Sequence, residues 1–236
     1  MSPSSRHWRW YASALFYELT YIRIAHQLDT ELFAYLRGRT QGAVVADCGC
    51  GPGVVTEKLL HRGAAQVFAI DVNPAMIHRV RSRLADAVAA GRVVIVHRAF
   101  DTLFFSDLRA RFLAGRGFDV ILFKRSLYLK PEQALPILQA AVASLNPDGV
   151  LAMVHADRSL RRYAFGPELR PTRYTLYHLI NRGFSWLGSR LGSSHYTLYS
   201  QVELLNLLRA AAPDRQVELI PSRQRAYHLA AVLNQR

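Results

Sequence analysis

Short apolar runs alternate with segments of helical character through the centre of the chain. The runs lie at 44–46, 67–70, 93–96, 120–123 and 150–154. Helical patterns follow the first four runs, as at 54–61 and 74–90, and residues 216–220 and 226–233 indicate two further strands. Strands that alternate with helices form βαβ units, and their parallel strands are buried on both faces. The pattern predicts an α/β fold with a mostly parallel sheet.

The 236 residues provide enough chain for one α/β domain with a sizeable core and too few for two. We therefore expect a single domain over 1–236, in which 41–157 is the core and 201–236 supplies a C-terminal helix and strands. The remaining segments, an N-terminal helical cap at 1–40 and an inserted lid at 158–200, are rich in aromatic residues. Such additions are natural walls for an apolar pocket, although an aromatic stripe on a helix is more often core. The candidate substrate-binding residues in them are Tyr11, Tyr17, Tyr21, Tyr163, Tyr174 and Tyr177.

Composition favours a soluble chain in a reducing compartment. No apolar run reaches the roughly 18–20 residues that a membrane-spanning helix needs, and the N-terminus lacks the pattern of a signal peptide. The two cysteines, Cys48 and Cys50, stand two positions apart in a glycine-rich loop, which does not suit a structural disulfide. We expect a cytoplasmic location.

The positive charge is large and uneven. The formal net charge is +13, and residues 158–236 contribute +8 of it, from twelve Arg against four acidic residues. A basic third of this kind suits an anionic substrate, a peripheral membrane contact or nucleic acid, but solvated arginines explain it equally well. No RNA-binding module is legible, so we expect no specific nucleic-acid partner.

The glycine-rich segment 44–53 reads as a strand, a sharp turn and the start of a helix. Its three glycines, Gly49, Gly51 and Gly53, allow a tight turn and a close approach of the backbone to a ligand. The dinucleotide fingerprint G-x-G-x-x-G does not fit, because its last position falls on Val54 or Thr56. A nicotinamide cofactor is therefore disfavoured.

The segment resembles the D-x-G-x-G-x-G motif of class I S-adenosylmethionine-dependent methyltransferases, of the small-molecule type that includes ubiquinone/menaquinone methyltransferases. The resemblance implies a Rossmann-like, seven-stranded, mostly parallel sheet with an antiparallel C-terminal strand and aromatic helical caps. It implies S-adenosylmethionine as cofactor, with Asp47 orienting the glycine loop and Asp71 accepting hydrogen bonds from the ribose hydroxyls. The positions that it assigns to the cofactor are Asp47, Gly49, Cys50, Gly51, Gly53, Asp71, Val72, Met76, Ala99, Phe100 and Phe123.

Two later positions depart from the family pattern. After the third strand, Ala99 stands where an acid usually binds the adenine amino group, so Asp101 either replaces that acid or caps a helix. At the end of the fourth strand, Lys124 and Arg125 are unusual, and they either meet an anionic substrate or are solvated.

Tyr128 and His155 are the candidate catalytic residues. Both follow strands at the edge where the resemblance places the transferred methyl group, and a histidine has the pKa range of a general base. No His/Cys/Asp cluster has metal-ligand spacing, so no metal is expected. The predicted function is methyl transfer to a small or medium apolar or aromatic acceptor, such as a natural product, terpenoid, quinone or lipid. An RNA methyltransferase and a regulatory protein that binds the cofactor without turnover are the alternatives.

Overall fold

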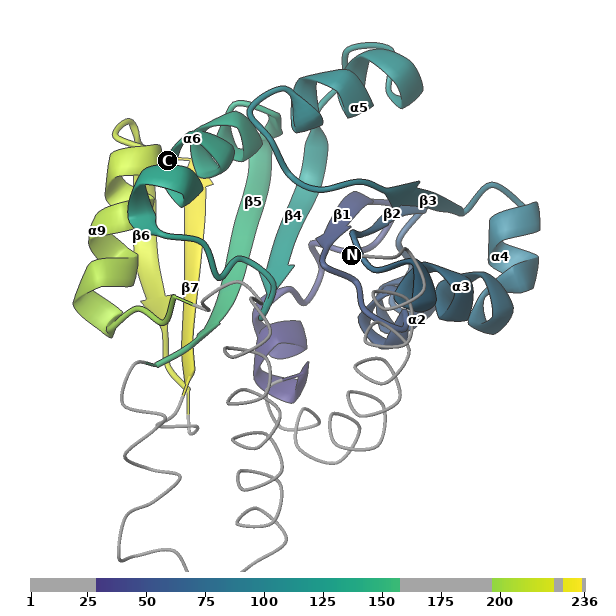
Figure 1. Ribbon diagram of the computed structural model, residues 1–236, viewed down its shortest axis with the longest axis horizontal. Coiled ribbons are helices and arrows are strands. Elements are labelled where there is room, and N and C mark those ends of the chain that lie inside the picture. The colour runs from purple at the N-terminus through teal and green to yellow at the C-terminus, as the bar shows by residue number, and fades with distance from the viewer. Residues whose placement is uncertain (1–28, 158–196, 223–226, 235–236) are drawn as a thin grey trace, which may run out of the picture.

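The computed structural model describes residues 29–157, 197–222 and 227–234. They form a seven-stranded sheet with the order β3-β2-β1-β4-β5-β7-β6 (Figure 1). The strands β1 to β5 pair in parallel, whereas β7 is antiparallel to both of its neighbours. The predicted seven-stranded, mostly parallel sheet with an antiparallel C-terminal strand is therefore confirmed.

The elements follow the predicted alternation. The strands are β1 (Val44–Cys48), β2 (Gln66–Asp71), β3 (Val93–His97), β4 (Phe118–Lys124), β5 (Leu145–Ala156), β6 (Arg215–Ile220) and β7 (Tyr227–Asn234). The labelled helices are α2 (Val54–His61), α3 (Pro74–Arg83), α4 (Ala85–Ala89), α5 (Phe104–Phe112), α6 (Pro131–Val142) and α9 (Gln201–Ala211). A further helical stretch covers residues 29–35. Within the described parts of the chain, no helix is long and apolar enough to cross a membrane.

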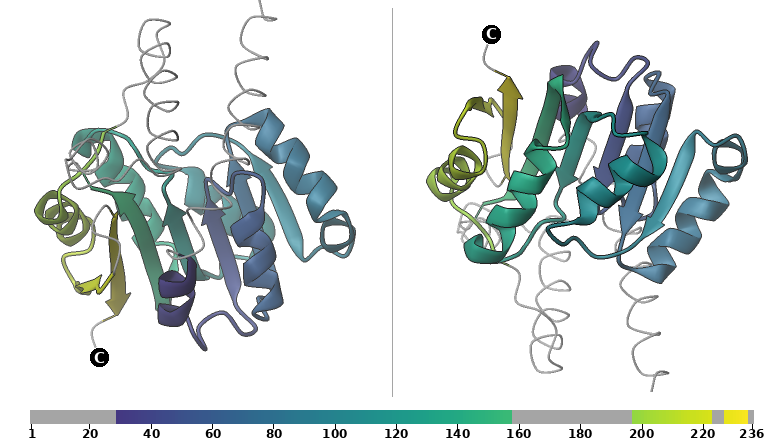
Figure 2. Two further views of the ribbon diagram at one scale, coloured as in Figure 1. Left: turned by 90° about the horizontal axis from the view of Figure 1, so that it is seen from below. Right: turned by 90° about the horizontal axis from the view of Figure 1, so that it is seen from above.

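Helices cover both faces of the sheet (Figures 1 and 2). The side chains of one face, such as Ile121 and Met153, pack against α5, α6 and α9. Those of the other face, such as Val120 and Val154, belong to a second cluster with α2, α3 and the stretch 29–35. Since both faces are covered, the central strands are apolar throughout, and the polar chemistry is confined to the strand ends.

Local sequence signals fix where several helices begin. Asn73 caps α3, because its side chain accepts hydrogen bonds from the backbone N–H groups of Ala75 and Met76, and Pro74 occupies the first helical position. Ser200 and Glu203 form a capping box at the start of α9. Both caps lie directly beyond strand or loop segments at the same edge of the sheet, and they set the path of the chain there.

Two expected boundaries are wrong. The helix expected over 74–90 is two helices, because Leu84, at φ −119° and ψ 32°, leaves the helical region and buries its side chain in the core. The fifth strand, expected at 150–154, already begins at Leu145, and its register against β4 shifts between Phe118 and Val120. The Asn146 side chain sustains that irregularity by accepting the Gly117 N–H at 2.8 Å and donating to Asp119 at 2.7 Å.

Candidate functional site

The glycine-rich turn follows β1 and lies against the end of β2. The backbone N–H groups of Gly49 and Cys50 both donate to the Ile70 carbonyl, at 2.7 and 2.9 Å. The three glycines of the turn have positive φ angles of 76°, 55° and 83°. Residues with a side chain rarely adopt this backbone region, so the turn depends on glycine.

Packing inside the protein leaves little room for a side chain at two of these glycines, and least at Gly49. A Cβ on Gly49 would lie 2.2 Å from the Cβ of Ser126, which follows β4. A Cβ on Gly53 would lie 3.2 Å from Val80 of α3. The turn is therefore held between the β4 loop on one side and α3 on the other.

Asp47 is buried at the end of β1, with 1 % of its surface exposed. Its carboxylate accepts a hydrogen bond of 2.7 Å from the Thr56 hydroxyl of α2. Burial raises the pKa of Asp47 to about 6, although the Thr56 hydrogen bond and the charge of Lys124 oppose this rise. The contact fixes α2 relative to β1, which is consistent with the predicted orienting role.

Asp71 joins the end of β2 to the glycine turn. One carboxylate oxygen accepts the Gly51 N–H at 2.9 Å, and the other accepts the Asn73 N–H at 2.8 Å. Burial raises the pKa of Asp71, and these backbone hydrogen bonds oppose the rise. A carboxylate has about four acceptor sites, so these two bonds leave acceptor capacity on Asp71. Beside it, Val72 is 51 % exposed, whereas Met76 is buried.

A pocket opens between the glycine turn, α2 and β4. Its lining residues are Asp47, Gly49, Cys50, Pro52, Val54, Val55 and Lys124. Three residues predicted to bind a cofactor, Asp47, Gly49 and Cys50, are thus brought together here. Gly51 is not in the lining, and it contributes through its hydrogen bond to Asp71.

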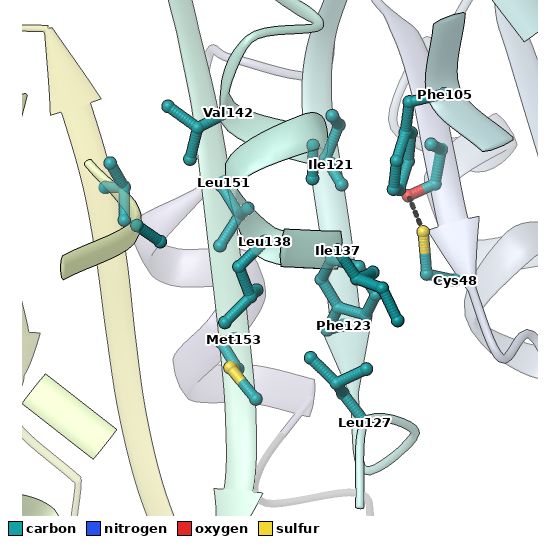
Figure 3. Packing of buried hydrophobic residues seen from close by; sticks show 14 of the residues in the cluster. Cys48, Phe105, Ile121, Phe123, Leu127, Ile137, Leu138, Val142, Leu151 and Met153 are labelled. Atoms are coloured by element: carbon teal, nitrogen blue, oxygen red, sulfur yellow. Dashed lines mark hydrogen bonds between the residues drawn. The ribbon is translucent and has the colours of Figure 1, made fainter. Parts of the chain in front are cut away.

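Three further positions predicted to bind the cofactor, Ala99, Phe100 and Phe123, differ in exposure. Ala99 is exposed, while the Phe100 ring packs edge-on against Phe104 and Phe123, with centroids 5.3 and 5.6 Å apart. The Phe123 side chain is fully buried in the core beside Leu127 (Figure 3). The prediction that Phe123 contacts the cofactor stays a prediction, and the buried side chain favours a contact through its backbone.

Asp101 is held by local contacts. It accepts the Leu103 N–H at 2.9 Å just before α5 and forms an ion pair with Arg98 at 2.6 Å. These two contacts favour a role at the helix start over replacement of the missing adenine-binding acid.

The structure brings Tyr128 and His155 together. Both were expected just after strands, and His155 lies within β5 because that strand extends to Ala156. Their ring centroids are 5.2 Å apart, and the Tyr199 ring lies 4.8 Å from His155 on another side. The His155 side chain is fully buried, and its Nε2 accepts the Tyr199 N–H at 3.2 Å. Burial, reinforced by the nearby His228, lowers the pKa of His155 to about 4.

The expectation that His155 is a general base at the cofactor edge stays a prediction, and this environment does not favour it. A base must reach the proton that it removes, and a fully buried ring whose Nε2 is already bonded cannot do so without rearrangement. His155 instead anchors the loop before α9. Tyr128, which is partly exposed, remains at the strand edge.

Sequence reasoning missed a buried ion pair beside the pocket. Lys124, at the end of β4, forms a salt bridge with Asp29, which also pairs with Lys58 of α2. Lys124 and Asp29 are each 3 % exposed. The lysine directly after a buried apolar run was the available signal, whereas nothing in the sequence marks Asp29 as its partner. The expectation that Lys124 is solvated is wrong.

The candidate substrate-binding tyrosines, Tyr11, Tyr17, Tyr21, Tyr163, Tyr174 and Tyr177, lie outside the described residues. At the same sheet edge, the Asp157 carboxylate and the His228 ring of β7 are hydrogen-bond partners. Among the residues that can be placed, no group of three His, Cys, Asp or Glu side chains is arranged to hold a metal ion.

Known proteins resemble this chain in part of its sequence and in its fold. Residues 45–149 match the family model of a methyltransferase domain. A search of curated proteins by sequence finds no match. Many solved structures share the fold.

Three of these structures illustrate how similar they are to this chain in fold, sequence identity and covered length. A complex of DhpI with SAH gives a TM-score of 0.63 at 17 % identity, over 99 % of this chain and 97 % of that one. Magnesium protoporphyrin IX methyltransferase from Synechocystis PCC 6803, with bound SAM, gives 0.57 at 15 % identity, over 91 % and 82 %. An O-methyltransferase family protein from Burkholderia thailandensis gives 0.61 at 18 % identity, over 88 % of this chain but only 56 % of that one.

Proposed function

We propose, from the premise that residues 45–149 form a class I S-adenosylmethionine-dependent methyltransferase domain, that this chain transfers the cofactor's methyl group to a small or medium apolar or aromatic acceptor. The observation that carries the proposal is the joint arrangement of the glycine turn and Asp71. That arrangement places a tight backbone turn, a pocket and a partly free carboxylate at the carboxyl ends of β1 and β2. Ligands of open α/β sheets bind at this edge.

The residues present fit S-adenosylmethionine. Gly49, Cys50 and Pro52 offer a lining without long side chains to the amino-acid end of the cofactor. Asp71 retains acceptor capacity for the ribose hydroxyls, and the exposed Val72 beside it offers an apolar surface to the adenine. Phe100 follows β3, the strand beside β2 in the sheet.

When bound, the cofactor supplies an electrophilic methyl group on a sulfonium sulfur, and the chain's own residues orient the reactants. The pocket would fix the amino-acid end and Asp71 the ribose, so that the methyl group points toward the ends of β4 and β5. Tyr128 is the partly exposed side chain that we expect beside the acceptor there. Because His155 is buried, we assign it no proton transfer.

The acceptor class rests on the two aromatic-rich segments at 7–37 and 158–200, which we propose as walls of the acceptor pocket. Magnesium protoporphyrin IX methyltransferase shares the fold, and its name identifies a small-molecule acceptor. We therefore favour a small organic acceptor over a macromolecule.

Incubation of the purified protein with methyl-labelled S-adenosylmethionine and a bacterial extract, followed by fractionation, tests the proposal. We expect the label in the fraction soluble in organic solvent. Label in RNA would instead support the RNA methyltransferase. Tight cofactor binding with no label in any fraction would support the regulatory alternative.

A further inference from the structure

His97 is the last residue of β3, and its register partner in the neighbouring strand β2 is Asp71. Register partners in a parallel pair place their side chains on the same face of the sheet. Burial raises the pKa of Asp71, and the backbone hydrogen bonds and the nearby His97 oppose this rise, so the ring and the carboxylate are close in space. Because His97 is exposed, its ring is accessible to a ligand at this edge.

One hydrogen bond determines which nitrogen of the His97 ring carries a proton. Nε2 lies 3.1 Å from the Val72 carbonyl oxygen, and a carbonyl oxygen only accepts, so Nε2 is the donor. In the uncharged ring, Nδ1 is then an acceptor. Nδ1 has no hydrogen-bond partner in the part of the chain that the structure describes. The ring is therefore held through one nitrogen and offers the other to a ligand.

The order of the strands places this acceptor on the base side of a nucleoside bound at Asp71. Asp71 ends β2, which lies between β1 and β3 in the sheet. The glycine turn that would receive the amino-acid end follows β1, and its Gly51 N–H is bonded to Asp71. A ribose held by Asp71 would therefore have its amino-acid end toward β1 and its base toward β3. On that side Val72 is 51 % exposed and offers an apolar surface to the base.

Asp101 is the other side chain shortly after β3 that could accept a hydrogen bond from the base. One of its oxygens accepts the Leu103 N–H at 2.9 Å, and the other accepts a hydrogen bond of 2.6 Å from Arg98. The side chains between His97 and Asp101 carry no hydrogen-bond acceptor. Both oxygens of Asp101 are thus engaged, which favours His97 as the acceptor for the base.

We propose that Nδ1 of His97 accepts a hydrogen bond from the exocyclic amino group of the cofactor's adenine and makes the site selective for an aminopurine. The inference rests on the proposed function, because it presupposes that S-adenosylmethionine binds at Asp71. The adenine amino group is a hydrogen-bond donor. A purine without that group would leave Nδ1 without a donor after water has been displaced, and the lost hydrogen bond would weaken binding.

Calorimetry with two ligands measures this selectivity. The ligands are S-adenosylhomocysteine, the demethylated product, and its analogue with an unsubstituted purine, which keeps the ribose and the amino-acid end. We expect the wild type to bind S-adenosylhomocysteine about 3- to 10-fold more tightly than the analogue, the range for a hydrogen bond between uncharged groups. The ratio of the two affinities is the readout, because a change that weakens the whole site leaves the ratio unchanged.

Two conservative variants separate the two nitrogens of the ring. The short amide of His97→Asn keeps an acceptor near the Nδ1 position, whereas the longer amide of His97→Gln reaches the Nε2 position and keeps a donor for the Val72 carbonyl. The preference for S-adenosylhomocysteine should persist in His97→Asn and fall below about twofold in His97→Gln. His61→Gln, at the exposed histidine that ends α2, and Asp101→Asn are the controls and should keep the preference of the wild type.

A preference that survives in His97→Gln would overturn the role of His97, because another group would then recognise the amino group. A preference lost equally in His97→Asn and His97→Gln would also overturn it, since the ring would then act only through its bond to Val72. A wild type that binds both ligands equally well would show that the amino group is not recognised. A wild type that binds neither ligand would instead overturn the proposed function.

Discussion

The backbone N–H of Gly51 donates a hydrogen bond of 2.9 Å to the carboxylate of Asp71, and this contact joins the glycine turn to the end of β2. The two residues are 20 positions apart in the sequence and come from different strand–helix units. The carboxylate that is expected to bind the ribose therefore also shapes the turn that is expected to receive the amino-acid end of the cofactor.

Replacement of Asp71 by Ala should weaken S-adenosylmethionine binding by about 10- to 100-fold. Each lost hydrogen bond to a charged group is worth about 1.5–3 kcal/mol, and the Gly51 N–H loses its partner as well. Calorimetry on the purified variant measures the change. Asp148→Ala removes an exposed carboxylate from the opposite end of the sheet and should leave the affinity unchanged. Equal affinities for the wild type and Asp71→Ala would contradict the assigned site.

Replacement of Gly49 by Ala should destabilise the fold through one neighbour. The new Cβ would lie 2.2 Å from the Ser126 Cβ, and overpacking costs about 1–3 kcal/mol. The positive φ adds about 1–2 kcal/mol for a residue with a Cβ. In the double variant with Ser126→Gly, the clash is removed. Urea unfolding should therefore show that this variant regains the part of the stability that Gly49→Ala lost through overpacking.

Gly91→Ala is the control for this pair, because Gly91 also has a positive φ but no atom within 4 Å of the added Cβ. Gly91→Ala should lower the free energy of unfolding only by the cost of the positive φ, about 1–2 kcal/mol. Additive losses for Gly49→Ala and Ser126→Gly would show that the two residues do not clash.

Replacement of His155 by Phe should remove a pH dependence of stability. The pKa of His155 in the folded protein is about 4, below the ordinary 6.5, so its contribution is present above pH 6.5 and is lost as the pH falls toward 4. At 1.36 kcal/mol per pKa unit, the full loss is about 3 kcal/mol. Between pH 7 and 4, the wild type should therefore lose about 3 kcal/mol of unfolding free energy relative to His155→Phe. His78→Phe, at an exposed position, should run parallel to the wild type.

The pH dependence of stability that comes from Asp47 should have the opposite sign to that of His155. Its folded pKa of about 6 is above the ordinary 3.8, so its contribution is present below pH 3.8 and is lost as the pH rises through 6. Asp47→Asn cannot ionise and keeps an acceptor for Thr56. The stability of this variant relative to the wild type should increase by up to about 3 kcal/mol from pH 3.5 to 7. Asp86→Asn, at an exposed site, should show no such trend, and a flat difference for Asp47→Asn would mean that its carboxylate is solvated.

The sheet could be predicted because its strands are short apolar runs between turn residues, and Val54–His61 was expected with the bounds of α2. The break between α3 and α4 at Leu84 could not be predicted, because the residues on both sides of it are compatible with a helix. The break depends on where Leu84 finds space in the core. The extra length of β5 likewise depends on a contact between distant residues, Asn146 and Asp119.

The candidate site was predictable to the extent that it is local in sequence. The glycine turn and Asp71 belong to one βαβ unit, and their spacing carries the signal. Asp29 and Lys124 are 95 positions apart, and their pairing follows from the packing of the stretch 29–35 on the sheet. The buried position of the His155 ring could not be predicted for the same reason, because its hydrogen-bond partner is Tyr199, 44 positions later.

The position of β7 between β5 and β6 has a consequence for synthesis of the chain. β5 receives its second neighbour only from Tyr227–Asn234, so one of its edges stays unpaired while about seventy further residues are translated. An unpaired apolar edge can pair with another chain, and β5 is long and buried on both sides in the finished sheet. The late β6–β7 hairpin is therefore the step that ends this exposure. Slow or truncated translation beyond residue 215 should favour aggregation of the nascent chain.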